Sequence, residues 1–365
     1  MSAKSYRVAV VGCGRIAGHH CRSIRDVPGA ELAAVCDLVE DKAAAYGREF
    51  SVPHFTNYHE MLRTVPGVDI VAVATPSGMH HEHALDLMRR YRVSIIMEKP
   101  TFMRPSQLRE AFALAAELGV SLFPVFQNRY NRAVDRVRTA LRSGELGKPR
   151  IVAVRVRWCR PQRYYDLASW RGTFAQDGGA LTNQGIHHVD LFRHLGGEVA
   201  RVQAAMRTLG ADVEVEDTAV GTATFENGHV GVVEVTTSAR PDDFEASISL
   251  VCEKGLAQIG GIAVNELQIF TPDPTACAAN SEDFAGNVYG HGHEMMYRDI
   301  VAALRGEAPY PVSADDCLRT IGLLHAFYRS DEDGGWIQVA DGLESGRLGK
   351  PDEALADLYR TPAPV

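Results

Sequence analysis

The feature that most constrains the fold is a glycine-rich turn between a short strand and a helix near the N-terminus. Val8–Val11 is a valine-rich strand, and a G-x-G-x-x-A run over residues 12–17 follows it directly. In this pattern the first glycine permits a tight turn, the second lets the backbone approach a pyrophosphate, and the alanine allows close helix–strand packing. The following helix directs its free N–H groups at that phosphate. We therefore predict a dinucleotide site at Gly12, Gly14, Arg15 and Ile16.

A carboxylate at the end of the next strand indicates which dinucleotide binds. The segment 31–37 is a predicted strand that ends in Asp37, and this acid lies 23 residues beyond Gly14. That spacing is typical of the carboxylate that accepts hydrogen bonds from the adenosine ribose hydroxyls. Because an acid repels a 2′-phosphate, we expect NAD as the cofactor rather than NADP.

Strands and helices continue to alternate as far as residue 126. The predicted strands are 69–74, Ser94–Met97 and Val120–Phe126, and the predicted helices include 41–50, 58–65 and Pro105–Leu118. Such alternation predicts a doubly wound parallel sheet of the Rossmann type over residues 1–126. Since ligands sit beyond the carboxyl ends of parallel strands, we place four further residues beside the turn. These are Thr75, Pro76, Glu98 and Lys99.

The helix after Pro76 carries three histidines, His80, His81 and His83. On a helix these positions spread over different faces, and no cysteine or carboxylate stands at ligand spacing. We therefore expect solvated or capping histidines, and no metal.

After residue 126 the pattern changes to period-two alternation. Predicted strands lie at Pro149–Arg157, 199–209, 217–225, 230–237, 246–252 and 256–259. Alternation with short turns predicts a large, mainly antiparallel open sheet. A chain of 365 residues exceeds what one core usually holds. We predict an α+β domain at 127–330, for substrate binding and oligomerisation, and a tail at 331–365 that packs on the surface or on a partner.

One predicted helix, residues 178–191, interrupts these strands. Asn183, His187 and Asp190 stand at i, i+4 and i+7 and share one face. Because the inward face of such a helix is usually apolar, this polar face indicates a functional role, with a core histidine as the alternative. A metal bound by His187 and Asp190 would need further ligands that the sequence does not offer.

The composition excludes several classes of protein. The formal net charge is −8 and no basic block occurs, which argues against nucleic acid as a partner. No apolar run reaches the roughly 18 residues of a membrane span, and the N-terminus does not read as a signal peptide. Seven scattered cysteines without a C-x-x-C pair are typical of reduced thiols, so we expect a cytoplasmic protein.

Three of these motifs together resemble the glucose–fructose oxidoreductase/inositol dehydrogenase (Gfo/Idh/MocA) family. They are the N-terminal glycine turn, the strand exit Glu98-Lys99-Pro100 and the Asn183-x-x-x-His187 helix. In that family the lysine and the histidine form the active site, so the resemblance implies Lys99 and His187 as catalytic residues. Many relatives have aspartate at position 183, where this chain has an amide. An aspartate-assisted proton relay there is therefore in doubt.

A narrower resemblance is to the bacterial oxidases (3-dehydrogenases) of UDP-N-acetyl-2-amino-2-deoxyglucuronate. It lies in residues 127–129, 160–166, 170–173 and 177–187. It implies substrate contacts at Lys99, Arg160, Tyr164, Tyr165, Asn183 and His187. It also implies cofactor contacts at His80, Asn128, Trp170 and Arg171.

The resemblance implies an NAD-dependent oxidoreductase that oxidises a secondary hydroxyl, the 3-OH, of a sugar or UDP-sugar acid. His187 would act as the general base and Lys99 would stabilise the alkoxide. Alternatives on the same fold are an inositol or free-sugar dehydrogenase, an NAD-dependent glycosidase and a non-catalytic NAD sensor. A homodimer or homotetramer is implied as well.

Overall fold

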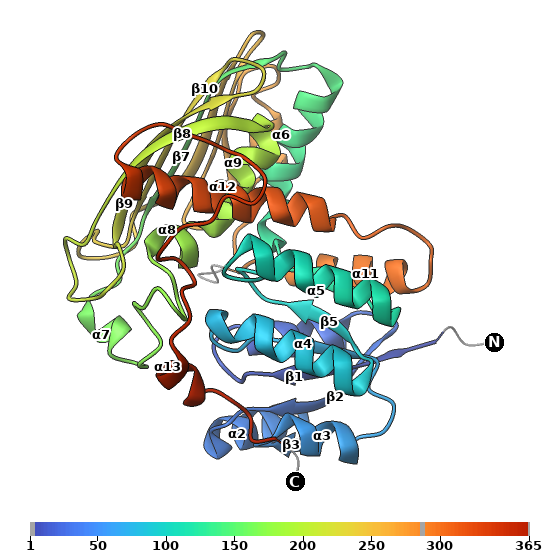
Figure 1. Cartoon of the computed structure of the whole chain (residues 1–365). Coiled ribbons are helices and arrows are strands. Elements are labelled where there is room, and N and C mark those ends of the chain that lie inside the picture. Colours follow the sequence, from blue (N-terminus) through green and yellow to red (C-terminus); the bar gives the residue numbers. More distant parts are fainter. Residues whose placement is uncertain (1–3, 285–288, 364–365) are drawn as a thin grey trace. The chain divides into compact units, whose positions relative to one another are not determined.

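The computed structural model describes residues 4–284 and 289–363, and these form two compact units (Figure 1). The first unit comprises the chain to Val125 together with His293–Leu318 and the segment from Pro351 onward. The second comprises Phe126–Gly292 and Arg319–Lys350. The sequence placed 127–330 in one domain, whereas the structure groups residues 293–318 with the N-terminal segment. The outermost residues of the predicted first domain and tail, 1–3 and 364–365, lie outside the described residues.

The first unit contains a six-stranded parallel sheet in the order β3-β2-β1-β4-β5-β6. Its strands are β1 (Tyr6–Val11), β2 (Ala30–Cys36), β3 (His54–Phe55), β4 (Ile70–Val73), β5 (Ser94–Met97) and β6 (Leu122–Pro124). The central strand β4 is buried at every position, as expected for a sheet covered on both faces. The strand order reverses between β1 and β4, which creates the crevice where dinucleotides bind in such sheets. The predicted doubly wound sheet is confirmed.

Helices between these strands, together with two helices from later segments of the chain, complete the unit. They are α1 (Ala17–Asp26), α2 (Glu40–Phe50), α3 (Tyr58–Thr64), η1 (Ser77–Met79), α4 (His80–Tyr91), α5 (Pro105–Leu118), α11 (Gly292–Leu304) and α13 (Glu353–Asp357). Helix α5 begins and ends at the predicted residues because Pro105 suits its first turn and Gly119 adopts a left-handed φ of 67° at its C-terminus.

The second unit contains an eight-stranded sheet in the order β13-β12-β11-β7-β10-β9-β8-β14. Its strands are β7 (Pro149–Arg157), β8 (Val199–Arg207), β9 (Thr218–Phe225), β10 (Val230–Thr236), β11 (Glu245–Cys252), β12 (Leu256–Gly260), β13 (Glu266–Phe270) and β14 (Ile337–Gln338). Neighbouring strands are antiparallel except β7 and β10, which are parallel. The predicted, mainly antiparallel sheet is confirmed. The sequence missed the short strands β13 and β14.

Helices cover one face of this sheet, and α9 packs on β7. The remaining elements are η2 (Gln127–Tyr130), α6 (Arg132–Ser143), α7 (Gln162–Tyr165), α8 (Ala180–Asn183), α9 (Ile186–Gly196), α10 (Ala276–Ala279) and α12 (Ala314–Asp333). On β7 the side chains of Val152, Val154 and Val156 are fully buried, whereas Ile151 and Arg155 point outward and are exposed. This is the alternation that the sequence predicted.

The predicted helix over residues 178–191 is wrong in one respect, because it is two helices. Helix α8 ends at Asn183 and α9 begins at Ile186, and the N–H of Gly185 bonds to the carbonyl of Ala180. The backbone at Gly185 is crowded, since a Cβ there would lie 2.8 Å from the carbonyl oxygen of Leu181. Asn183 is therefore the last residue of α8, whereas His187 and Asp190 belong to α9.

Candidate active site

Four loops of the first unit leave the same edge of its sheet. The last residues of β1, β2, β4 and β5 stand in register, since Val11 pairs with Cys36 and Val73, and Val73 pairs with Met97. Gly12, Asp37, Thr75 and Lys99 follow these strands directly or within two residues, and β1 and β4 flank the switch point. The structure therefore brings these predicted residues to one rim.

The glycine turn has the shape that a pyrophosphate requires. Gly12 adopts a φ of +97°, and a Cβ there would lie 2.4 Å from the carbonyl oxygen of Ala74. In contrast, a Cβ on Gly14 would meet no atom within 4 Å. Helix α1 begins just beyond, with Ile16 at its N-cap and no side chain capping its N–H groups. The open space beside Gly14 and the uncapped helix N-terminus fit the phosphates of a dinucleotide.

Asp37 is fixed close to this turn. Its carboxylate accepts hydrogen bonds from the backbone N–H of Cys13 at 2.8 Å and of Val39 at 2.8 Å. A carboxylate offers about four acceptor positions, so capacity remains for ribose hydroxyls. The residues of this crevice therefore fit a bound NAD.

Two of the three histidines of α4 are buried. The expectation of solvated histidines is therefore wrong for His80 and His83. His80 and His83 are buried, with exposed fractions of 1% and 2%. The ring of His80 contacts the carbonyl oxygens of Thr75 at 3.0 Å and Pro100 at 2.8 Å, while His83 Nδ1 lies 3.0 Å from the Thr75 hydroxyl. Burial lowers the pKa of both histidines. His80 thus joins the loops after β4 and β5, whereas His83 contacts the loop after β4, and a direct cofactor contact by His80 stays a prediction.

The Glu98 carboxylate is buried beneath Lys99. Its Oε1 lies 2.9 Å from His20 Nε2 and 3.2 Å from His293 Nε2, and its Oε2 accepts the backbone N–H of Lys99 at 3.1 Å. Burial raises the pKa of this carboxyl, but the hydrogen bonds from the two histidines outweigh it and hold the pKa well below its usual range. Among the described residues, these three side chains are also the group whose ligand-type atoms converge within 4.8 Å.

In the second unit His187 is held by η2. The side-chain amide nitrogen of Gln127 lies 3.1 Å from His187 Nε2. Because an amide nitrogen only donates, Nε2 accepts this bond and the ring proton sits on Nδ1. His187 therefore presents the lone pair of Nε2 on the side of Gln127, which is the form that a general base needs. The sequence pointed to Gln127 only within the narrower resemblance, over residues 127–129, and gave no signal of this contact.

The neighbouring turn of α9 is anchored to the same segment. Arg129 donates two hydrogen bonds to Asp190, at 2.7 and 2.5 Å, and the hydroxyl of Thr320 donates a third at 2.9 Å. Asp190 is 1% exposed, and although burial raises the pKa of its carboxyl, the charge of Arg129 holds it below the usual value. His187 and Asp190 therefore both contact residues of η2, and Asp190 has a structural partner.

Asn183 faces a different carboxylate. Its amide nitrogen donates to Asp177, which is 1% exposed and also accepts the backbone N–H of Gly172 at 2.7 Å. Asp177 therefore orients Asn183 and holds the loop before α8. The sequence did not single out Asp177, because nothing in its spacing sets it apart from an ordinary loop acid.

Several predicted contacts form a cluster of rings and guanidinium groups. The guanidinium of Arg171 lies over the rings of Tyr164 at 4.5 Å and Trp170 at 4.4 Å, and it donates to the Tyr164 hydroxyl at 2.7 Å. Arg160 lies 5.6 Å from the centre of the Tyr164 ring and donates to Asp243 at 2.8 Å. The structure thus brings these predicted residues together within the second unit.

Two predicted contacts are instead largely enclosed. Tyr165 is 6% exposed, and its hydroxyl lies 3.0 Å from that of Thr237, which gives it a packing role. Asn128 is 8% exposed within η2. Lys99 belongs to the first unit and His187 to the second, so their meeting over one substrate stays a prediction.

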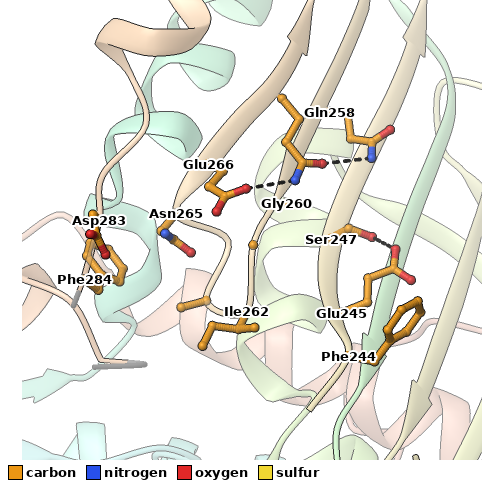
Figure 2. A pocket seen from close by; sticks show the side chains of 13 residues that line it. Phe244, Glu245, Ser247, Gln258, Gly260, Ile262, Asn265, Glu266, Asp283 and Phe284 are labelled. Carbon is orange, nitrogen blue, oxygen red and sulfur yellow. Dashed lines mark hydrogen bonds between the residues drawn. The ribbon is translucent and has the colours of Figure 1, made fainter. Parts of the chain in front are cut away.

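A separate hollow lies at the β11–β13 end of the eight-stranded sheet (Figure 2). Its walls carry three carboxylates and three amides. Gln268 donates to Glu266 at 3.0 Å and accepts from Gln258 at 3.2 Å, while the hydroxyl of Ser247 donates to Glu245 at 2.5 Å. None of the predicted site residues lines this pocket.

No helix among the described residues is both long and apolar enough to cross a bilayer.

Comparison with protein-family models gives two matches. Residues 6–126 match the model of the oxidoreductase family with an NAD-binding Rossmann fold. Residues 134–258 match the model of the GFO/IDH/MocA C-terminal domain.

Three similar proteins cover almost the whole chain. The WlbA dehydrogenase from Bordetella pertussis, solved with NADH and UDP-GlcNAcA, is 34% identical; the match covers 93% of this chain and 99% of that one, with a TM-score of 0.86. The WlbA dehydrogenase from Chromobacterium violaceum, solved with the same ligands, is also 34% identical. That match covers 93% of this chain and 98% of the other, with a TM-score of 0.85. The D-apiose dehydrogenase of Paraburkholderia graminis is 26% identical over 93% of this chain and 91% of that protein.

Proposed function

Because the chain belongs to the Gfo/Idh/MocA family of oxidoreductases, we propose that it oxidises the 3-hydroxyl of a UDP-linked amino-sugar uronate with NAD. The predictions of the family, of an NAD-binding Rossmann domain and of a dehydrogenase acting on CH–OH groups are confirmed. The substrate is the proposed part. It is supported above all by the 34% identity to dehydrogenases solved with NADH and UDP-GlcNAcA.

The proposed reaction needs a proton acceptor and a cation at one substrate oxygen. In the proposal the substrate hydroxyl replaces the Gln127 amide at His187 Nε2, and this nitrogen takes the proton. The Lys99 ammonium donates a hydrogen bond to the same oxygen and stabilises the negative charge that develops there. Bound NAD supplies the acceptor for the hydride. Arg160 would pair with the uronate or the diphosphate of the substrate.

The first test is turnover of a substrate panel by the purified protein with NAD. The panel contains UDP-GlcNAcA, UDP-glucuronate, UDP-GlcNAc, D-apiose, myo-inositol and an aryl glucoside. We expect reduced nicotinamide and a 3-keto product with UDP-GlcNAcA. Preference for D-apiose or myo-inositol would make the protein a free-sugar or inositol dehydrogenase. A cleaved glycosidic bond would identify a glycosidase. NAD binding without any turnover would indicate a sensor.

Substitution of the two proposed catalytic residues provides the second test. Lys99→Ala removes the donor to the developing alkoxide and should lower kcat by about 10²–10³-fold. His187→Ala removes the base and should lower kcat by about 10²–10⁴-fold. NADH affinity, followed by fluorescence titration, should stay within about twofold of the wild-type value in both variants. Near-normal kcat in either variant would contradict the role proposed for that residue.

A further inference from the structure

We propose that Glu98 is a positioning residue that holds Lys99 in place through a buried hydrogen-bond network built from His20, His293 and Tyr297. The inference rests on the proposed function, because Glu98 would act through Lys99.

The network runs through one connected set of contacts. The Tyr297 hydroxyl lies 2.8 Å from His20 Nδ1, and His20 Nε2 lies 2.9 Å from Glu98 Oε1. His293 Nε2 reaches the same Oε1 at 3.2 Å, and Glu98 Oε2 accepts the Lys99 N–H at 3.1 Å. The four buried side chains have exposed fractions between 1% and 4%, so water does not compete for these bonds.

The chemistry of the groups fixes where the protons are. A carboxylate only accepts, so the Nε2 atoms of His20 and His293 both carry hydrogens. On the other side of the His20 ring, Nδ1 pairs with the Tyr297 hydroxyl at 2.8 Å. Burial raises the pKa of Tyr297 and lowers that of His293, which keeps both groups neutral. The network therefore directs two imidazole N–H groups at one oxygen of the Glu98 carboxylate, whose other oxygen accepts the backbone N–H of Lys99.

A metal ion explains these side chains less well. Both histidines approach Glu98 at ordinary hydrogen-bond distances, 2.9 and 3.2 Å, and both would have to lose their Nε2 hydrogens to bind a metal. Hydrogen bonds already occupy both oxygens of the carboxylate.

The network also joins Lys99 to the phosphate-binding end of the unit. His20 lies in the second turn of α1, the helix that follows the glycine turn, whereas Glu98 lies at the end of β5. His293 and Tyr297 come from α11, almost 200 residues further along the chain. Three elements thus fix the strand exit, and an error of about 1 Å at a catalytic group can cost about 10²-fold in rate.

The test compares Glu98→Gln with a matched control, His59→Asn. His59 is also a buried histidine of the first unit, but it contacts α4: its Nδ1 lies 2.8 Å from the Tyr91 hydroxyl and its Nε2 lies 3.7 Å from Asp86. We expect Glu98→Gln to lower kcat about 10- to 100-fold with a smaller change in KM, and to speed hydrogen–deuterium exchange in peptides that contain Lys99. His59→Asn should leave both quantities unchanged.

A double-mutant cycle separates positioning from general stability. Because Glu98 would act through Lys99, adding Glu98→Gln to Lys99→Ala should lower kcat no further, whereas a purely structural defect would add to the loss. If Glu98→Gln folds poorly, His293→Asn serves instead, since it removes one donor and keeps the carboxylate. It should produce a smaller loss of kcat in the same direction.

The outcomes distinguish the two proposals. Normal kcat in Lys99→Ala contradicts the proposed function. A large loss in Lys99→Ala with normal kcat and normal exchange in Glu98→Gln overturns the positioning role. Unchanged hydrogen–deuterium exchange near Lys99 in Glu98→Gln would also overturn the positioning role, and this result does not depend on finding a substrate. Stoichiometric metal in the purified protein that disappears in Glu98→Gln would overturn the hydrogen-bonded network itself.

Discussion

Two glycines of one turn serve different purposes, and the difference can be measured. Gly12→Ala would force a Cβ against Ala74 in a backbone conformation that favours glycine. We expect a lower melting temperature and at least tenfold weaker NADH binding. Gly14→Ala has room within the protein, so its melting temperature should stay close to that of the wild type. Its Cβ would nevertheless stand where the protein backbone approaches the pyrophosphate of the cofactor, which should weaken NADH binding.

Thermal melts without ligand and fluorescence titrations with NADH check both variants. The informative result is the contrast between the two positions. Unchanged NADH affinity in Gly14→Ala would mean that the phosphates do not pass beside this residue.

The residues that sequence reasoning found and missed differ in one physical respect. Gly12, Asp37 and Lys99 could be predicted because they follow strands whose ends meet at one edge. Gln127 contacts His187 across 60 positions, and His293 contacts Glu98 across 195. Such pairs come together only through tertiary packing, and a single sequence without an alignment does not show which distant residues pack together.

At the scale of elements, a buried carboxyl couples α8 to α12. Glu216, just before β9, accepts the Tyr328 hydroxyl at 2.7 Å and the backbone N–H of Leu181 at 3.1 Å. Burial raises the pKa of Glu216 to about 7, although the bond from Tyr328 opposes the shift. The group that joins these two helices therefore titrates near neutral pH.

This shift makes stability depend on pH in a predictable direction. Between about pH 4.5 and 7 the folded protein retains a proton that the unfolded chain releases, so stability should fall as the pH rises through this window. The free energy of unfolding should fall by about 3 kcal/mol at most across this window, because each pKa unit corresponds to about 1.4 kcal/mol. Glu216→Gln should flatten this dependence in urea unfolding series at several pH values. The exposed Glu226→Gln should keep the wild-type slope, and an unchanged slope in Glu216→Gln would contradict the prediction.

Secondary structure was predicted well where patterns were long and poorly where they were short. Helix α5 has its predicted bounds because Gly119 ends it in a left-handed conformation. The break at Gly185 was missed, since helical spacing continues across it, although the N–H of Gly185 bonds to the carbonyl of Ala180, five residues back, instead of to that of Leu181. The two-residue strand β14 exists only through its pairing with β8.

For the whole molecule, the outward face of the eight-stranded sheet carries an apolar row. Val230, Ile151, Val251 and Leu256 pair across β10, β7, β11 and β12, and their exposed fractions lie between 39% and 47%. We expect this row to lie against a second copy of the chain, in line with the predicted dimer or tetramer.

Placing a charge on the row tests this expectation. Ile151→Glu should reduce the molar mass measured by light scattering toward that of a monomer, because burying the carboxylate between two copies is costly. Gln203→Glu adds the same charge at an exposed position of β8 and should leave the mass unchanged. An unaltered mass in Ile151→Glu would exclude this face as the contact.

The chain passes from one unit to the other four times, near residues 125, 292, 318 and 350. A proteolytic fragment that ended at residue 126 would retain every strand of the six-stranded sheet but would lack His293 and Tyr297. Glu98 would then keep only one histidine donor for its buried charge. The N-terminal nucleotide-binding segment is therefore incomplete by itself. A fusion protein built on it would also have to include the distant C-terminal segments of the first unit.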